Sequence, residues 1–260
     1  MSNHHAAAPR TGTLLGVWAH PDDEAFLSAA LMARARAMGD RVVVATATRG
    51  ERGTSDPERW PPERLAPLRE QELARSLDIL GVSEHRWLGH RDGELAEVRR
   101  SAVVSQIADL IDEVRPDTVV TFGPDGMTGH DDHRTVSGWV TDAWWRAGRP
   151  GRLWYATLTP SFHHRWGRLN DEVGLWFEGS RPPATSEADL AGQVFFDEEL
   201  VEQKYAALRA HASQLDGLVR LVGEERFRRW WAQEFFVAAP EVARVPVEEL
   251  TQQEVSHAGR

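Results

Sequence analysis

Apolar runs and helical patterns alternate along most of the chain. Short runs rich in Val, Leu and Thr occupy residues 14–20, 41–48 and 117–124, and each suits a strand buried on both faces. Between them, apolar residues recur at helical spacing, most clearly over 24–38 and 63–81, and a glycine closes both patterns. This alternation is typical of parallel strand–helix–strand units. We therefore predict an α/β fold of Rossmann-like type, with a mostly parallel sheet and helices on both faces.

Weaker patterns predict further elements, which are strands over 85–90 and 152–160 and helices within 94–116, 133–148 and 197–215. Residues 225–239 fit a short helix or a helix–strand junction, while His163 and His164 are expected in a loop. No repeat or linker interrupts the chain. We expect one domain over 1–260, with its core at about 14–215 and a polar tail from Val242 onward.

Composition narrows the class of protein. Among 260 residues, 41% are hydrophobic and 27% are charged, which is ordinary for a soluble globular protein. A net charge of −10 argues against nucleic acid or an anionic membrane as a partner. The chain has no cysteine, which excludes thiolate metal sites and is compatible with a reducing compartment. With no signal peptide pattern or long apolar run, we expect a soluble, cytoplasmic protein.

Tryptophan is unusually frequent, with 11 residues against two tyrosines. We interpret Trp144–Trp145 and Trp230–Trp231 as core rather than as a platform that stacks on sugars. A surplus of tryptophan also occurs at interfaces, so a homo-oligomer is compatible with the sequence.

Four polar clusters follow predicted strands, at the sheet edge where such folds bind ligands. They are His20–Asp23, Arg49–Gly53, Arg91–Asp92 and Gly123–His133. The first cluster, "HPDDE", lacks the glycine-rich turn that a dinucleotide pyrophosphate requires, which argues against that type of cofactor. We expect the four clusters to converge on one site.

Two of these clusters carry metal-binding residue types. His20 and Asp23 are three residues apart, and His130 and His133 repeat that spacing. Two histidines and one carboxylate with an open position form a common catalytic zinc arrangement. Asp22 would then be free to take a proton from water. Either acid could cap the helix that begins near Glu24, but caps do not explain both clusters.

The motifs "AHPDDE" and "GHDDH" resemble those of the LmbE-like (PIG-L) N-deacetylase family, as do "TRGERG", "REQELARSLDILG", "RDGEL" and "KYAALRAHASQ". The resemblance spans about residues 14 to 215. The family includes enzymes that deacetylate N-acetylglucosaminyl-phosphatidylinositol and enzymes of the mycothiol and bacillithiol pathways. The resemblance implies hydrolysis of an N-acetyl or other N-acyl group on a small-molecule amino sugar or sugar conjugate. It implies Zn²⁺ as cofactor, with another divalent metal such as Fe²⁺ as the alternative.

The same resemblance implies roles for individual residues. His20, Asp23 and His133 match the family's metal ligands, and Asp22 matches the base that activates the zinc-bound water. His130 matches the histidine that stabilises the oxyanion and protonates the leaving amine. Some members carry a tyrosine just before "GH", where this chain has Met127 and Thr128, so a further oxyanion donor stays unassigned.

Roles around this centre are also expected. Asp132 would orient an imidazole, with His130 as the candidate, while Arg69 and Asp92 would contact sugar hydroxyls by the resemblance. It also suggests that His211 approaches the site. From the residue types alone, Arg49 could bind an anionic group of the substrate and Glu51 a hydroxyl.

Two other functions compete with hydrolysis. The facial triad of non-haem iron oxygenases also consists of two histidines and one carboxylate, but it needs neither Asp22 nor His130. A sugar-binding protein without turnover is the second alternative, although none of the five central residues is missing. The particular substrate is not encoded in these motifs.

Overall fold

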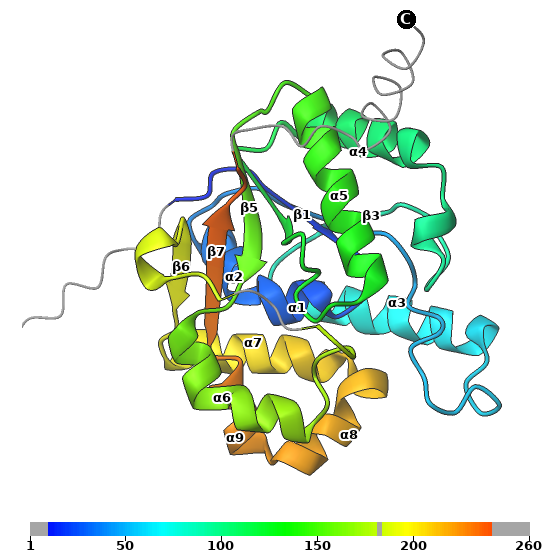
Figure 1. Cartoon of the computed structure of the whole chain (residues 1–260), viewed down its shortest axis with the longest axis vertical. Coiled ribbons are helices and arrows are strands. Elements are labelled where there is room, and N and C mark those ends of the chain that lie inside the picture. Colours follow the sequence, from blue (N-terminus) through cyan, green and yellow to red (C-terminus); the bar gives the residue numbers. More distant parts are fainter. Residues whose placement is uncertain (1–9, 181–183, 241–260) are drawn as a thin grey trace, which may run out of the picture.

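The computed structural model describes residues 10–180 and 184–240. Its centre is a seven-stranded sheet in the order β3-β2-β1-β4-β5-β7-β6 (Figure 1). The strands are β1 (Leu14–Trp18), β2 (Val42–Thr46), β3 (Glu84–Trp87), β4 (Thr118–Phe122), β5 (Arg152–Thr157), β6 (Gly192–Phe195) and β7 (Gln233–Ala238). The first five pair in parallel, and β7 runs antiparallel between β5 and β6. The predicted mostly parallel sheet is confirmed.

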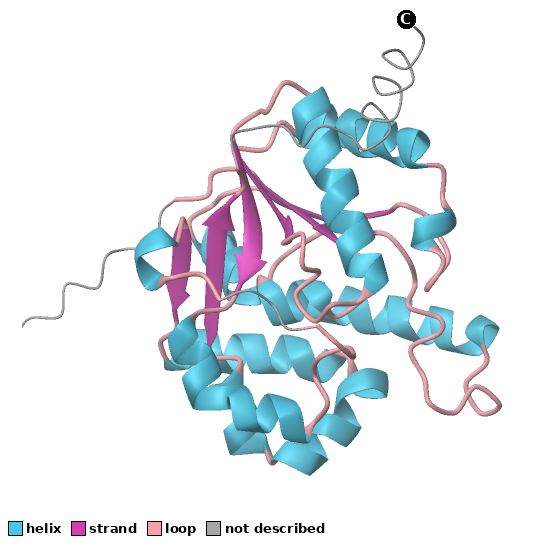
Figure 2. Ribbon diagram, in the orientation of Figure 1, coloured by secondary structure: helices cyan, strands magenta, loops and turns pink. Residues whose placement is uncertain are grey.

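Helices cover both faces of the sheet (Figure 2). They are α1 (Asp23–Leu27), α2 (Ala29–Ala37), α3 (Pro62–Ile79), α4 (Arg100–Val114), α5 (Asp131–Arg146), α6 (Pro160–Glu172), α7 (Glu198–Ala210), α8 (Ala212–Val222) and α9 (Glu224–Trp230). Two 3₁₀ helices span Leu95–Glu97 and Glu187–Asp189. In Figure 1, α5 crosses in front of the sheet and α2 lies behind it. Among the described helices, none combines the length and the apolar character that crossing a membrane requires.

The central strands bring the two histidine clusters together. Every residue of β1, β2 and β4 is buried, as their continuous apolar runs predict. The strand order reverses at β1, which pairs with β2 on one side and β4 on the other. Ligands of such sheets bind outside the carboxyl ends of the strands at this reversal. The segments after β1 and β4 therefore lie side by side, although about a hundred residues separate them in sequence.

The helix predicted over 24–38 is two helices, because the backbone breaks at Ser28. Glu234 of β7 accepts hydrogen bonds from the backbone N–H groups of Ala30 and Leu31, both at 2.9 Å. Lys204 of α7 donates to the same carboxylate at 2.8 Å. A buried carboxylate thus satisfies free N–H groups at the start of α2, and the new helix begins there.

The C-terminal part differs most from the expectations. His163 and His164 lie in α6 rather than in a loop, and Thr159 caps this helix by accepting from Phe162 N at 3.2 Å. The helix predicted over 197–215 breaks at His211 into α7 and α8. Strand β6 was not predicted. Residues 225–239 hold most of α9 and then β7, which confirms the expected helix–strand junction, and the sheet therefore continues beyond residue 215. The expected polar tail lies outside the described residues.

Candidate active site

The side chains of His20, Asp23 and His133 converge where β1 and β4 end. Nδ1 of His20 lies 3.2 Å from Nε2 of His133, which is 3.3 Å from Oδ1 of Asp23. Oδ2 of Asp23 lies 3.6 Å from Nδ1 of His20. Tetrahedral zinc with bonds of about 2.0–2.1 Å places neighbouring ligand atoms about 3.3 Å apart. The three side chains therefore fit around one ion of this size, and all three are buried.

Hydrogen bonds orient both imidazoles for this task. His133 donates from Nδ1 to the carbonyl oxygen of Gly126 at 3.0 Å, which leaves the lone pair on Nε2. Nε2 of His20 lies 3.2 Å from Asp132 Oδ2 and 3.1 Å from Asp92 Oδ1, so it donates its proton to these carboxylates, and Nδ1 faces the other two ligand side chains. Metal-bound histidines are held in this way, with the outer N–H donated to a carbonyl or carboxylate. The donor set thus fits a divalent cation.

The surrounding charges favour a cation at the centre. Burial opposes charge on His20, but its hydrogen bonds to Asp132 and Asp92 and the nearby Asp23 raise its pKa to about 10. Burial also opposes charge on Asp23, yet His133 and His20 hold the pKa of this carboxyl far below its usual range. The cluster is therefore built to surround positive charge with ionised carboxylates.

Asp22 has a different environment from its neighbour. Its backbone has φ 109°, in the left-handed region that strains residues other than glycine. Its N–H donates to Glu24 Oε2 at 3.1 Å, and its Oδ2 accepts from Arg69 at 3.1 Å. Burial raises the pKa of Asp22 to about 6, although Arg69 lowers it. Asp22 is thus a half-buried carboxyl suited to accept a proton near neutral pH.

Arg69 of α3 fixes the loop that carries this acid. It donates to the carbonyl oxygens of Pro21 and Gly50, the latter at 2.7 Å. Gly50 has φ 63°, and a β-carbon there would collide with the guanidinium group. The glycine of "TRGERG" therefore leaves the space that Arg69 needs to hold Asp22.

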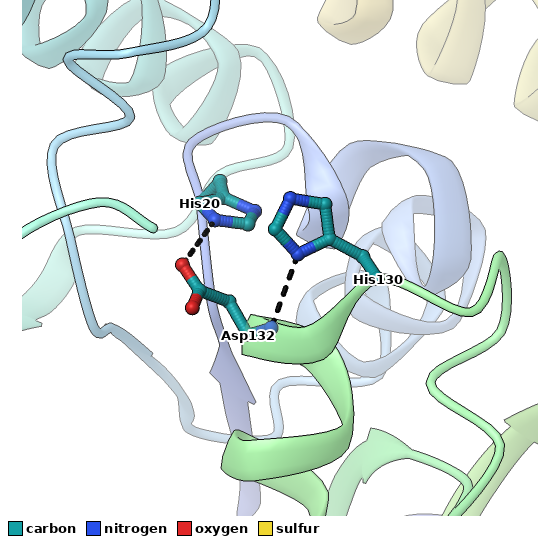
Figure 3. Close-up of side chains that lie close together, drawn as sticks. All are labelled: His20, His130 and Asp132. Carbon is teal, nitrogen blue, oxygen red and sulfur yellow. Dashed lines mark hydrogen bonds and ion pairs between the residues drawn. The ribbon is translucent and has the colours of Figure 1, made fainter. Parts of the chain in front are cut away.

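His130 is the N-cap of α5, and Figure 3 shows its ring beside His20 and Asp132. Its Nδ1 accepts from the backbone N–H of Asp132 at 3.1 Å, so the proton of the neutral ring sits on Nε2. Burial, together with His20 and His133, lowers the pKa of His130. The ring is thus a neutral N–H donor. The imidazole that the carboxylate of Asp132 orients is His20, whereas the backbone of Asp132 orients His130.

The other residues expected at the site lie partly at the cavity and partly away from it. Arg69 and Asp92 line the cavity over the histidines, although both already bond to protein groups. Glu51 accepts from the backbone N–H of Asp92 at 3.0 Å and so holds the loop. Arg49 pairs with Glu70 and stacks over Trp87, and within the described chain the cavity lining does not include it. His211 is fully buried against Glu24, at 3.2 Å.

The cavity has a volume of about 380 Å³, within the size range of small-molecule sites. Part of its lining was not predicted from the sequence, namely Phe177, Leu218, Trp230 and Trp231. Arg52, which also lines the cavity, belongs to the cluster Arg49–Gly53 that was expected at the site. Both tryptophans of the pair are buried, as expected for core, yet they also line the cavity. The amphipathic pattern of 212–222 and the tryptophan surplus were the available signals.

A half-buried acid beside three convergent ligands, at the switch point of an α/β sheet, is the arrangement of a metal-dependent hydrolase. The family model described as PIG-L, GlcNAc-PI de-N-acetylase, matches residues 15–144. A 1D-myo-inositol 2-acetamido-2-deoxy-alpha-D-glucopyranoside deacetylase of Saccharomonospora viridis is 35% identical over 228 residues, which cover 78% of this chain and 85% of that protein. The chain belongs to the PIG-L family.

Solved structures agree on the fold. A conserved protein of Thermus thermophilus superposes with a TM-score of 0.61 at 26% identity, covering 90% of this chain and 97% of its own. The N,N'-diacetylchitobiose deacetylase of Pyrococcus horikoshii gives a TM-score of 0.60 at 22% identity, covering 92% of this chain and 89% of its own. The second likeness concerns the fold alone.

Proposed function

We propose that the protein is an N-deacetylase that hydrolyses the acetamide of an amino sugar or of its conjugate, with a divalent cation, first of all Zn²⁺. The observation that carries this proposal is the spacing of 3.2 to 3.6 Å among the three ligand side chains, with the separate acid Asp22 beside them. The named deacetylases among the relatives support it.

His20, Asp23 and His133 would hold the cation, which supplies Lewis acidity and lowers the pKa of water toward 7. Asp22 takes the proton of the attacking water, because Arg69 aims its carboxylate and burial raises its pKa. His130 donates from Nε2 to the carbonyl oxygen as negative charge develops there. When the C–N bond breaks, the nitrogen must gain a proton, and Asp22 returns to it the proton that it took from the water.

The competing functions explain less of the structure. An iron oxygenase would use the same triad, but its chemistry gives no role to Asp22. Yet hydrogen bonds with Arg69 and Glu24 hold Asp22 in its strained backbone conformation. A sugar-binding protein without turnover would not need a proton acceptor beside the ligands. Location in the cytoplasm and self-association stay predictions from the sequence.

The test is amine release from N-acetylglucosamine and from its inositol conjugate, followed before and after treatment with a chelator. We expect activity that the chelator abolishes and that Zn²⁺ restores, with Fe²⁺ as the comparison. Asp22→Asn prepared in parallel controls for contaminating enzymes. Hydrolysis that persists without a cation would overturn the mechanism, and oxygen consumption without amine release would favour the oxygenase.

A further inference from the structure

Asp22 is the N-cap residue of α1, yet its side chain does not cap the helix. An acid at this position usually accepts a hydrogen bond from an N–H group of the first turn. The carboxylate of Asp22 makes no such bond and lines the cavity instead, where it accepts from Arg69 at 3.1 Å. Its backbone has φ 109°, and a strained conformation of this kind persists only where its surroundings hold it.

Glu24 supplies one of the bonds that hold this backbone. Its Oε2 accepts from the N–H of Asp22 at 3.1 Å, much as a glutamate of the first turn does in a capping box. The other carboxylate oxygen, Oε1, lies 3.2 Å from Nε2 of His211. Glu24 is fully buried, so water does not replace either partner. The direction of its carboxylate therefore depends on His211.

The side chain of His211 has a single hydrogen bond within the described part of the chain, the one to Glu24. Its Nδ1 is buried without a partner, and the residue as a whole is fully buried. A buried polar atom without a partner opposes folding. An apolar side chain would therefore fill this position better if packing were its whole purpose. The imidazole is explained by what its Nε2 does to Glu24.

The junction between α7 and α8, where His211 lies, is held by a second buried carboxylate. The N–H and the hydroxyl of Ser213 donate to Glu72 at 2.7 and 2.6 Å. Glu72 is buried on α3, one turn after Arg69. The junction is thus attached to α3 without any help from His211. The bond between His211 and Glu24 is a separate connection, and it leads to the loop that carries Asp22.

We propose that His211 is a positioning residue for the reaction. It fixes the carboxylate of Glu24, which holds the N–H of Asp22 and so keeps the carboxylate of Asp22 turned toward the cavity. This inference rests on the proposed function, in which Asp22 accepts the proton of the attacking water. Among the described residues, the cavity lining includes neither His211 nor Glu24. Both therefore act on the reaction through Asp22 and do not touch the substrate.

Substitutions of His211 test this role by kinetics. Misplacement of a reacting group typically costs about 10²-fold in rate, so kcat of His211→Leu should fall by about this factor. KM and cation affinity should change little. His211→Gln should keep most of kcat, because its amide nitrogen takes the place of Nε2 and donates to Glu24. If His211→Leu does not fold, His211→Asn takes its place, since its amide nitrogen corresponds to Nδ1.

Ser213→Ala is the matched control. It removes a hydrogen bond between the same junction and a buried carboxylate, but it leaves Glu24 and Asp22 untouched. We expect kcat of this variant to stay close to that of the wild type. Equal kcat in His211→Leu and Ser213→Ala overturns the proposal.

A double variant shows whether His211 acts through Asp22. Residues that act as one unit have effects that do not add. His211→Leu combined with Asp22→Asn should therefore turn over about as fast as Asp22→Asn alone. If His211 only supports the fold, the double variant should lose about a further 10²-fold, and that result overturns the proposal.

Hydrogen exchange at the backbone amide of Asp22, followed by NMR in the cation-free protein, tests the same connection without turnover. Relative to the amides of β1, which report unfolding of the whole domain, this amide should exchange faster in His211→Leu than in wild type or Ser213→Ala. Equal relative exchange in the two variants overturns the proposal. If the wild type releases no amine from any acetamide, the deacetylase is wrong, and exchange at Asp22 still decides whether His211 holds this residue.

Discussion

Glu24 connects His211 to the backbone of Asp22. One of its carboxylate oxygens lies 3.2 Å from Nε2 of His211, and the other accepts from the N–H of Asp22 at 3.1 Å. Glu24 and His211 are both fully buried. His211, at the junction between α7 and α8, is therefore connected through Glu24 to the loop that carries the proposed base, Asp22.

The His211–Glu24 pair predicts a pH-dependent stability. Burial opposes charge on His211, but the hydrogen bond and charge of Glu24 raise its pKa, aided by Asp22 and opposed by Arg69. A raised pKa stabilises the fold fully below the unfolded value of about 6.5, and this stabilisation is lost as pH rises through the folded value. His211→Gln should therefore differ most from wild type in free energy of unfolding at low pH, and the difference should narrow toward alkaline pH.

Urea titrations at several pH values measure this difference. His164→Gln is the control, since His164 is an exposed histidine on α6. A gap between His211→Gln and wild type that stays constant with pH would show that the pair does not titrate as described.

Asp22→Asn separates the base from the ligands. The amide keeps the size of the side chain but cannot accept the proton, so turnover should fall about 10²–10⁴-fold. The bound cation should stay, because Asp23 supplies the carboxylate of the triad. Elemental analysis of the variant, alongside the activity assay, measures whether the cation is still bound. Loss of the cation would indicate that Asp22 is a ligand and not only the base.

His130→Ala should remove the oxyanion donor. Loss of one such donor typically costs about 10²–10³-fold in kcat. The cation should remain bound, since His130 is outside the triad, and KM should change much less than kcat. Full activity in this variant would assign the oxyanion to another group, and a cation-free protein would assign His130 to the ligands.

Asp132→Asn should weaken cation binding about 10–100-fold, because it disturbs the hydrogen bond that fixes the ring of His20. Asp131→Asn is a close control, since the neighbouring side chain is 86% exposed. Competition with a chromophoric chelator measures both affinities without any substrate. Equal affinities in the two variants would remove the orienting role of Asp132.

Lys204→Met tests the buried pair that holds the start of α2. Lys204 and Glu234 are almost inaccessible to solvent. Removal of the lysine ammonium group leaves the buried carboxylate of Glu234 without its charged partner. We expect a loss of about 3–5 kcal/mol in the free energy of unfolding. Arg229→Met breaks an exposed pair with Glu225 and should change it by less than about 0.5 kcal/mol. Chemical denaturation of both variants gives the comparison.

The sequence predicted the catalytic half of the molecule better than the cavity wall. Buried parallel strands have continuous apolar runs, and the carboxyl ends of neighbouring parallel strands meet at one sheet edge, so the sequence alone places His20 and His133 together. The breaks at Ser28 and His211 depend on Glu234 and Glu24, which are distant in sequence from the helices they interrupt. No local pattern encodes such contacts.

The apolar part of the cavity lining escaped prediction for another reason. Trp230 and Leu218 have the sequence pattern of core residues, because an apolar side chain that borders a cavity follows the same helical period as one that packs in the interior. The partner of Asp132 was missed similarly. Its carboxylate crosses to the first cluster, and that contact follows from the pairing of β1 with β4.

The left-handed backbone at Asp22 also bears on evolution. A residue other than glycine in this conformation costs about 1–3 kcal/mol, which is a substantial part of the stability of a typical domain. If folding alone were under selection, glycine would be the favoured residue at position 22. An aspartate there indicates that selection has accepted a less stable protein in exchange for a proton acceptor. Selection for thermal stability alone should therefore favour substitutions of Asp22, and these substitutions should cost activity.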